Sequence, residues 1–100
     1  MKFARNVSFT IKAGKETEFT NLFEKEVVPM LRKQNGFLEE VTLVNPKNAI
    51  GISLWDNRQS AETYQTTMYP QVLAKLVGVI DGSPKVETYE TASSYSRATI

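Results

Sequence analysis

Two polar side chains lie where the local pattern would give them chemistry. Asn6 sits in the middle of a strand-like segment, where asparagine is disfavoured. Its amide could hold a substrate oxygen, or a developing oxyanion or peroxide, inside an apolar cavity. Tyr64 lies on the inner face of a helical pattern, where its hydroxyl could share a hydrogen bond with a ligand. We take Asn6 and Tyr64 as candidate catalytic residues. The alternatives, a polar side chain at a sheet edge and a core tyrosine with its hydroxyl at the rim, stay open.

Large apolar side chains could form the wall of a site beside these two residues. Trp55 ends a strand pattern, where it could stack on a flat ligand or simply fill the core. Phe23, Met30, Met68 and Tyr69 would line any pocket between sheet and helices, although such a stripe is also typical of ordinary core. We expect Trp55, Phe23, Met68 and Tyr69 to contact a small hydrophobic or aromatic ligand.

The charged side chains show no catalytic or metal-binding spacing. Arg5 interrupts an apolar strand face, where it could pair with a carboxylate across a dimer, such as Glu90, or bind an anionic group. The carboxylates are spread along the chain, without the spacing of a paired acid and base or of a metal cage. There is no glycine-rich phosphate loop. We therefore predict no metal site.

The sequence contains no cysteine and no histidine. Missing cysteine excludes disulfides and thiolate catalysis. Missing histidine removes the commonest base near neutral pH, the usual transition-metal ligand and the usual axial ligand of haem iron. A Ser–His–Asp triad is impossible. We expect no cofactor, and any general base must come from elsewhere.

Charge and hydropathy argue against nucleic-acid and membrane partners. The 100 residues carry 12 basic and 11 acidic side chains, a net charge of +1. Such a balance favours neither nucleic acid nor an anionic membrane. No apolar run approaches the roughly 20 residues that span a bilayer, and the first residues show no signal-peptide pattern. The expected location is the cytoplasm.

Residues 49–64 organise the predicted fold. Apolar and small residues alternate over 49–55, which predicts a strand, and helical spacing follows from Ala61 through Tyr64 to Met68. Asn57 is a plausible N-cap between the two patterns. A strand therefore leads directly into a helix that carries Tyr64.

The remaining elements follow from the same two periods. Alternation predicts strands over 3–12, 37–44 and 86–91, and a helix covers 15–34. Pro29 should kink this helix and Gly36 should end it. Residues 45–48 predict a hairpin turn, Pro70 starts a second helical piece, and residues 81–84 predict a loop. The structure of the polar tail 93–100 stays open.

The order β-α-β-β-α-β predicts one α+β domain over residues 1–100, with its core in 3–92. This is the ferredoxin-like split βαβ arrangement, a four-stranded antiparallel sheet with helices on one face. The even face of the first strand is small and mildly polar rather than charged. One chain has no elements left to cover it, so we predict a homodimer joined through the sheet faces. A monomer with an amphipathic sheet is the alternative.

The chain resembles the antibiotic biosynthesis monooxygenase (ABM) family over residues 3–92. The resemblance rests on the sequence Gln34-Asn35-Gly36-Phe37, on Leu54-Trp55 and on the helix over 57–64. It implies a dimeric α/β barrel. The family includes cofactor-independent oxygenases of polycyclic phenols and quinols, haem-degrading enzymes and members of unknown activity.

The first six residues are also similar to the haem-degrading branch, which has an asparagine at the position of Asn6. That branch has a tryptophan on the second helix, at the position of Tyr64, and a histidine ten residues later, at or near Ala74. This chain keeps the asparagine, replaces tryptophan by tyrosine and lacks the histidine.

Three functions follow from the resemblance and the residues. The first is a monooxygenase, possibly cofactor-independent, that acts on a flat phenolic or quinol-type molecule. Asn6 would orient its oxygen function and Tyr64 would contact its ring or hydroxyl. The second is a non-catalytic dimer that binds a small hydrophobic ligand. The third, haem binding or degradation, has the least support because the iron would lack its histidine.

Overall fold

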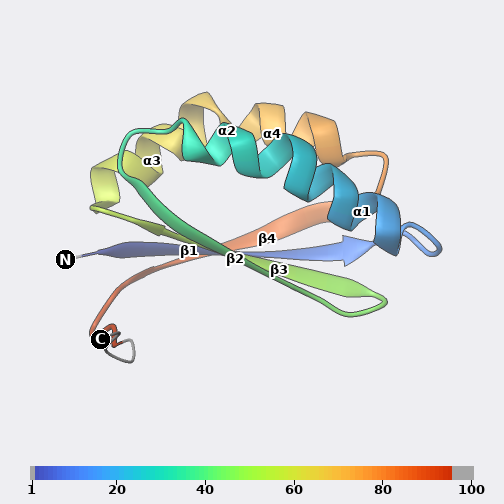
Figure 1. Ribbon diagram of the computed structural model, residues 1–100, viewed down its shortest axis with the longest axis horizontal. Coiled ribbons are helices and arrows are strands. Elements are labelled where there is room, and N and C mark those ends of the chain that lie inside the picture. Colours follow the sequence, from blue (N-terminus) through green and yellow to red (C-terminus); the bar gives the residue numbers. More distant parts are fainter. Residues whose placement is uncertain (1, 96–100) are drawn as a thin grey trace, which may run out of the picture.

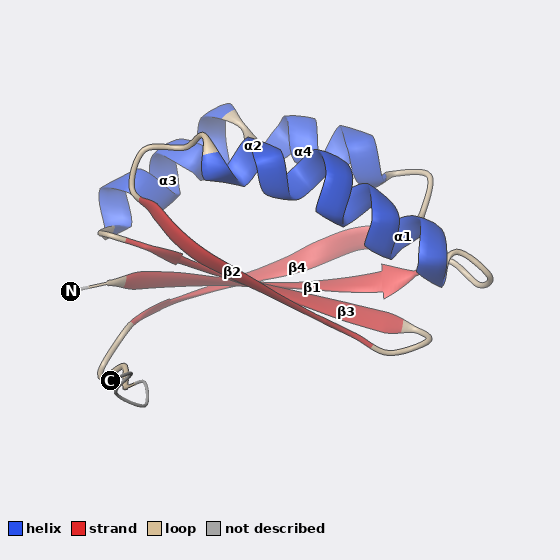
Figure 2. Ribbon diagram, in the orientation of Figure 1, coloured by secondary structure: helices blue, strands red, loops and turns tan. Residues whose placement is uncertain are grey.

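A twisted four-stranded sheet carries all the helices on one of its faces (Figures 1 and 2). The computed structural model describes residues 2–95. Its elements in order are β1 (Phe3–Ile11), α1 (Glu16–Leu22), η1 (Phe23–Val27), α2 (Val28–Arg32), β2 (Phe37–Val44), β3 (Asn48–Trp55), α3 (Arg58–Thr67), α4 (Tyr69–Leu76) and β4 (Ile80–Glu90). The strand order is β2-β3-β1-β4, with all neighbours antiparallel. The predicted ferredoxin-like fold is confirmed.

Alternation along β1 decides which side chains meet the helices. Phe3, Arg5, Val7, Phe9 and Ile11 are buried, and the residues between them face the other side. On β3 the inner positions hold Ala49, Gly51, Ser53 and Trp55, which pair with the buried positions of β1. Small residues on the inner face of β3 leave room beneath the helices. The larger Ile50, Ile52 and Leu54 point to the outer face.

The first helical stretch changes winding in its middle. The predicted kink takes the form of a π-helical segment, η1, directly before Pro29. A proline has no N–H to donate and its ring pushes the carbonyl of residue i−4 aside, so the wider turn accommodates it. Phe23 and Val27 of this segment are buried. The segment therefore turns two apolar side chains toward the sheet.

The corner from α2 into β2 and the corner from β3 into α3 meet at Gly36. Its φ of +81° is a left-handed conformation that glycine adopts at little cost. Its carbonyl accepts a hydrogen bond from the N–H of Asp56 at 2.8 Å. The predicted cap of α3 is confirmed, since the side chain of Asn57 accepts from the N–H of Ser60 at 2.9 Å.

The predicted loop over residues 81–84 is wrong, because these residues lie within β4. The pairing of β4 with β1 shifts register between Ser8 and Thr10, so extra residues of β4 are accommodated there. Gly82 adopts a φ of +67° in this irregular part. Turn-forming residues thus build a bulge inside a longer strand. The end of the tail, residues 96–100, lies outside the described residues.

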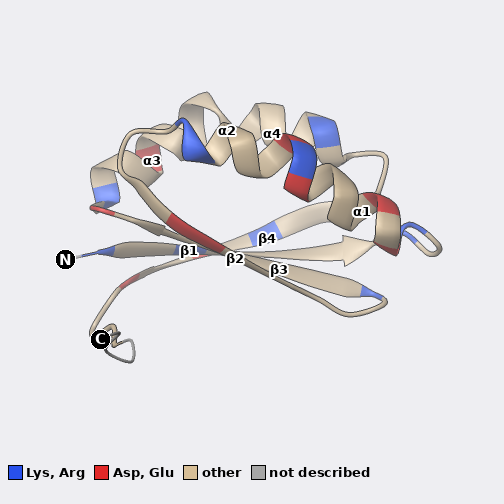
Figure 3. Ribbon diagram, in the orientation of Figure 1, with Lys and Arg blue, Asp and Glu red and all other residues tan. Residues whose placement is uncertain are grey.

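Within residues 2–95 no helix covers the outer face of the sheet, and this face is apolar over β2 and β3. Val41, Leu43 and Tyr89 are exposed there. Ile52 pairs with Val41 on one side and with Asn6 on the other, and Asn6 in turn pairs with Glu87. The apolar surface therefore covers β2 and β3 and gives way to polar side chains on β1 and β4. Figure 3 shows charges on the helices, on the turns and on parts of β1, β2 and β4, with β3 uncharged along its length. In residues 2–95, no helix is long and apolar enough to cross a membrane.

Candidate functional site

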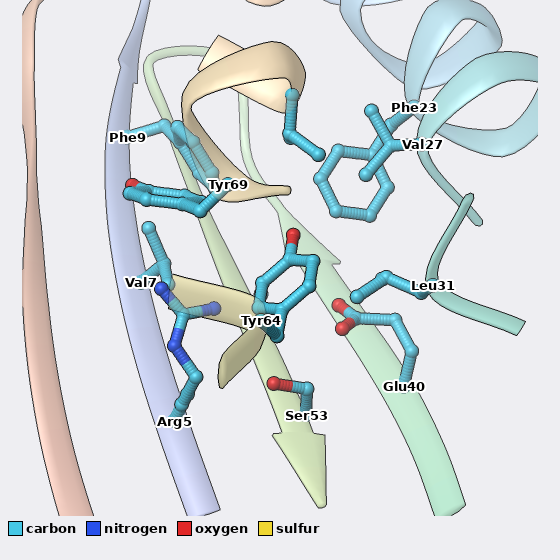
Figure 4. A pocket seen from close by; sticks show the side chains of 12 residues that line it. Arg5, Val7, Phe9, Phe23, Val27, Leu31, Glu40, Ser53, Tyr64 and Tyr69 are labelled. Atoms are coloured by element: carbon cyan, nitrogen blue, oxygen red, sulfur yellow. The ribbon is translucent and has the colours of Figure 1, made fainter. Parts of the chain in front are cut away.

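A cavity of about 20 Å³ lies between the sheet and the helices (Figure 4). A single water molecule needs about 10–15 Å³ of such space. Side chains from three strands, β1, β2 and β3, and from the helical segments η1, α2, α3 and α4 contribute to its wall. The lining residues are Arg5, Val7, Phe9, Phe23, Val27, Leu31, Glu40, Gly51, Ser53, Tyr64, Tyr69 and Val72. The wall is therefore mostly apolar, and its polar members are Arg5, Glu40, Ser53, Tyr64 and Tyr69.

Arg5 brings a positive charge into this wall from β1. Its side chain is only 3% exposed. The guanidinium carbon lies 4.9 Å from the ring centre of Tyr64 and 4.6 Å from that of Tyr69. One terminal nitrogen donates a hydrogen bond to the side-chain oxygen of Gln65, and Nε has no partner among the described residues. Burying an arginine with a free donor is costly, so this arrangement suits a group that accepts a hydrogen bond.

Tyr64 and Tyr69 present their hydroxyls from α3 and α4. Burial raises the pKa of Tyr64 to about 12, although the positive charge of Arg5 acts in the opposite direction. Burial likewise raises the pKa of Tyr69. Both hydroxyls therefore stay protonated near neutral pH and can donate. In the part of the chain that the structure describes, the buried hydroxyl of Tyr69 has no hydrogen-bond partner.

Glu40 is a functional candidate that the sequence pattern did not reveal. It lines the cavity from β2, and its Oε2 accepts a hydrogen bond from Thr42 Oγ1 at 3.1 Å. Burial raises the pKa of Glu40 to about 7, while Thr42 and the charge of Arg5 lower it by less. A register shift between Phe37 and Glu39 turns Glu40 inward. Simple alternation from Phe37 would have placed Glu39 on the inner face. Glu40 could therefore have been predicted as a cavity residue only if the bulge had been known.

Trp55 packs against the ring of Tyr64 and does not itself line the cavity. It is fully buried, and its Nε1 donates to Ser53 Oγ at 2.9 Å. Its ring centre lies 5.0 Å from that of Tyr64 and 5.6 Å from that of Phe37. These packed rings fix the orientation of Tyr64.

Three of the predicted site residues meet at the cavity, namely Phe23, Tyr64 and Tyr69. Met68 is partly buried and packs against the core, away from the lining. Asn6 lies on the opposite face of β1, in register with Ile52 and Glu87. The structure therefore does not bring Asn6 and Tyr64 together within one chain.

Arg5 occupies the inner position next to Asn6, because successive side chains of a strand point to opposite faces. Glu90, suggested as a partner of Arg5 across a dimer, does not pair with Arg5 within one chain. Glu90 pairs with Arg58 of the same chain at 3.2 Å. Arg5 is held by Gln65 and by the two tyrosine rings.

A second hollow shares Arg5 with the cavity. It has a volume of about 180 Å³ and lies beside α3, β1 and β4. Its lining includes Arg5, Gln65, Arg58, Phe3 and Tyr89. We call the first hollow the inner cavity and the second the outer groove. Both lie on the helix side of the sheet, and Arg5 lines both. Across residues 2–95, no three acidic, histidine or cysteine side chains gather as a metal site would require.

The sheet topology and the helices on one face place the chain among the ferredoxin-like α+β proteins. The sequence profile of the family described as antibiotic biosynthesis monooxygenase matches residues 3–75. The chain therefore belongs to the ABM family, as the resemblance predicted. No curated protein matches it in sequence.

Solved structures of low sequence identity share the fold. A protein of unknown function from Nitrosomonas europaea is 15% identical, with a TM-score of 0.80 and 98% and 96% of the two chains covered. SnoaB, a cofactor-independent oxygenase from Streptomyces nogalater, is 12% identical, with a TM-score of 0.78 over 96% of this chain and 98% of that one. A monooxygenase from the ActVA-Orf6 gene of Streptomyces coelicolor, solved with nanaomycin D, is 14% identical, with a TM-score of 0.77 over 96% and 92%.

Proposed function

We propose that this protein is a cofactor-independent monooxygenase that acts on a flat phenolic or quinol-type molecule. The observation that carries the proposal is the buried guanidinium of Arg5, which faces the cavity beside Tyr64 and Tyr69 with a free donor. Ordinary core would not hold this group. A phenolate oxygen is an anion that accepts hydrogen bonds, so it complements both the charge and the free donor. SnoaB shows that the fold supports such chemistry in another protein.

The expected chemistry needs an ionised substrate. A phenolate can pass one electron to dioxygen, and the two radicals then combine at a ring carbon. Arg5 would hold the phenolate oxygen, and Tyr64 would donate a hydrogen bond to it or contact the ring. The apolar walls from Phe23, Val27 and Leu31 exclude water and orient the reactants.

The substrate ring must enter through the outer groove. The inner cavity of about 20 Å³ accommodates a molecule the size of water or dioxygen. The groove of about 180 Å³ exceeds the volume of about 150 Å³ that holds benzene in another protein. Rotation of Arg5 away from Gln65 would join the two hollows. A ring in the groove would then present its hydroxyl to the inner polar groups.

Oxygen consumption with a panel of hydroquinones and naphthohydroquinones tests the proposal. Labelled dioxygen distinguishes monooxygenation, which transfers one labelled oxygen to the product, from simple oxidation with release of hydrogen peroxide. Tyr64→Phe and Arg5→Met should each lower the labelled product at least tenfold, while Arg32→Met, an exposed arginine on α2, should not. Absence of labelled product above the buffer background contradicts the proposal.

A second candidate function, binding of a small hydrophobic ligand without chemistry, is favoured by the small volume of the inner cavity. Side chains already fill most of the space under the helices. In this case a hydroquinone would bind in the outer groove, as seen by calorimetry, without consuming oxygen. Calorimetry and oxygen uptake on the same sample therefore separate the two functions.

We also propose that two chains associate through the outer faces of their sheets. Exposed Val41, Leu43 and Tyr89 with half-buried Ile50 and Ile52 support this arrangement. A second copy is the expected occupant because the surface is apolar over β2 and β3 and residues 2–95 hold no further element to cover it. Asn6 would then face the partner, where its amide could serve the interface.

A further inference from the structure

We propose that Glu40 is the general base that ionises a substrate whose ring lies in the outer groove and whose hydroxyl reaches the inner cavity. This inference rests on the proposed function, and it assigns a catalytic role to a residue that the ABM resemblance did not point to. It also supplies the base that the absence of histidine leaves open.

The position of Glu40 fits this role. Its carboxylate and the guanidinium of Arg5 both line the cavity, and the ring of Tyr64 lies between them in Figure 4. A substrate hydroxyl that enters the cavity therefore finds an acceptor and a cation in the same wall. Gly51 keeps the space open, since a Cβ at that position would lie 3.1 Å from Glu40 Oε2. The absence of a side chain at Gly51 thus lets the carboxylate of Glu40 lie against β3 in the cavity wall.

The other polar groups around the cavity do not suit the task. Tyr64 and Tyr69 hold their protons because burial raises the pKa of each hydroxyl. Ser53 accepts a hydrogen bond from Trp55. The charged and titratable groups that face Glu40 are Arg5 on β1, Tyr64 on α3 and Tyr69 on α4, and the side chains from η1 and α2 are apolar. Burial places the pKa of Glu40 at about 7, where an acid can both take and return a proton.

The reaction balances with dioxygen as the only oxidant. Glu40 takes the hydroxyl proton of the quinol, and the phenolate gives one electron to dioxygen. The resulting superoxide and substrate radical form a C–O bond at the neighbouring ring carbon, and the peroxide anion takes the proton back from Glu40. Glu40 then removes the hydrogen of that carbon as the O–O bond breaks, and the departing hydroxide becomes water. For 1,4-naphthohydroquinone, C10H8O2 and O2 yield the hydroxynaphthoquinone C10H6O3 and H2O.

The test compares Glu40→Gln with wild type on two substrates. One is 1,4-naphthohydroquinone, which is protonated at neutral pH, and the other is a nitro-substituted hydroquinone that is largely ionised there. Glu40→Gln should lower the rate on the protonated substrate at least thirtyfold and the rate on the ionised one less than threefold. Wild-type activity on the protonated substrate should rise with pH around 7, and the variant should lose this rise. Glu24→Gln, at an exposed position of η1, is the matched control.

The outcomes separate the two proposals. If wild type oxygenates neither substrate, the proposed function fails. If wild type is active but Glu40→Gln slows both substrates equally, or neither, then Glu40 is not the base although the enzyme is an oxygenase. Circular dichroism and a thermal melt establish that the variant is folded. Carbon-13 NMR of labelled glutamate gives an independent readout, and a Glu40 carboxyl that titrates near 4.5, the ordinary value of a glutamate, overturns the inference.

Discussion

At the scale of single residues, the buried carboxyl of Glu40 links folding to proton binding. Folding raises its pKa from 4.5 to about 7. Between these two values the folded protein binds more protons than the unfolded chain, so stability falls as pH rises. The stabilisation that the protonated carboxyl gives the folded protein is complete below about pH 4.5, and it is lost as pH rises through the folded pKa. Because the chain has no histidine, few other side chains titrate in this window.

We predict that the free energy of unfolding decreases by up to about 3 kcal/mol between pH 5 and pH 8. Urea denaturation at several pH values measures it. Glu40→Gln should remove most of the decrease because glutamine does not titrate, whereas Glu24→Gln should keep it. A flat profile for wild type would show that the carboxyl is ionised at little cost in the folded protein.

The strand pattern predicted some of the site residues and not others, for reasons visible at single positions. Alternation along β1 puts Arg5 on the apolar face and Asn6 on the opposite face, which the structure confirms. Resemblance to a family nevertheless drew attention to Asn6. Glu40 could not be found by alternation, because the bulge between Phe37 and Glu39 changes which side chains of β2 face inward.

At the scale of elements, the junction at Gly36 fixes how two strand–helix corners meet. An added Cβ would clash with the side chains of Asp56 and Ser60, which begin the corner into α3. The positive φ of Gly36 adds backbone strain for any other residue. The close packing of this junction holds α3, and with it Tyr64, over the sheet.

We predict that Gly36→Ala destabilises the protein by about 2–4 kcal/mol, from strain plus overpacking. Gly14→Ala is the matched control: Gly14 has a φ of +76° but no atoms within 4 Å of an added Cβ. Strain alone should make it cost about 1 kcal/mol. Thermal melts of the two variants give the difference, and equal losses would show that the clash is relieved by movement of Ser60.

Periodicity predicted the existence and order of the elements, and their irregular parts were harder to predict. Pro29 indicated a kink, yet its form as a π-helical segment depends on packing of Phe23 and Val27 against the sheet. Asp81, Gly82 and Pro84 looked like a loop because they favour turns. Pairing with β1 extends the strand through them. Tertiary contacts override local preference at both places.

At the scale of the whole molecule, one layer of helices covers one face of the sheet (Figure 1), and the other face is apolar over β2 and β3. A lone chain would expose Val41, Leu43 and Tyr89 to water. Association of two sheets would remove this surface, and each copy would keep its own cavity beneath its helices. The site and the proposed interface therefore lie on opposite faces of the same sheet.

We predict that light scattering after size exclusion gives the mass of two chains. Val41→Glu should shift the population to single chains, because a carboxylate in an apolar interface is costly to bury. Val77→Glu is the control, since Val77 is 67% exposed beyond α4 on the side of the helices, compared with 42% for Val41. Wild type with the mass of one chain at micromolar concentration contradicts the proposed dimer.

The fluorescence of the single tryptophan, Trp55, can report on the cavity. Trp55 is fully buried, and its ring centre lies 5.0 Å from that of Tyr64, whose ring also contacts the guanidinium of Arg5. Its fluorescence should be blue-shifted in the folded protein, and a quinone that passes Arg5 and presents an oxygen to the inner cavity should quench it by electron transfer over this short distance. A quinone that stays in the outer groove should quench much less. Emission spectra of one unlabelled sample would therefore reveal whether a ligand passes Arg5.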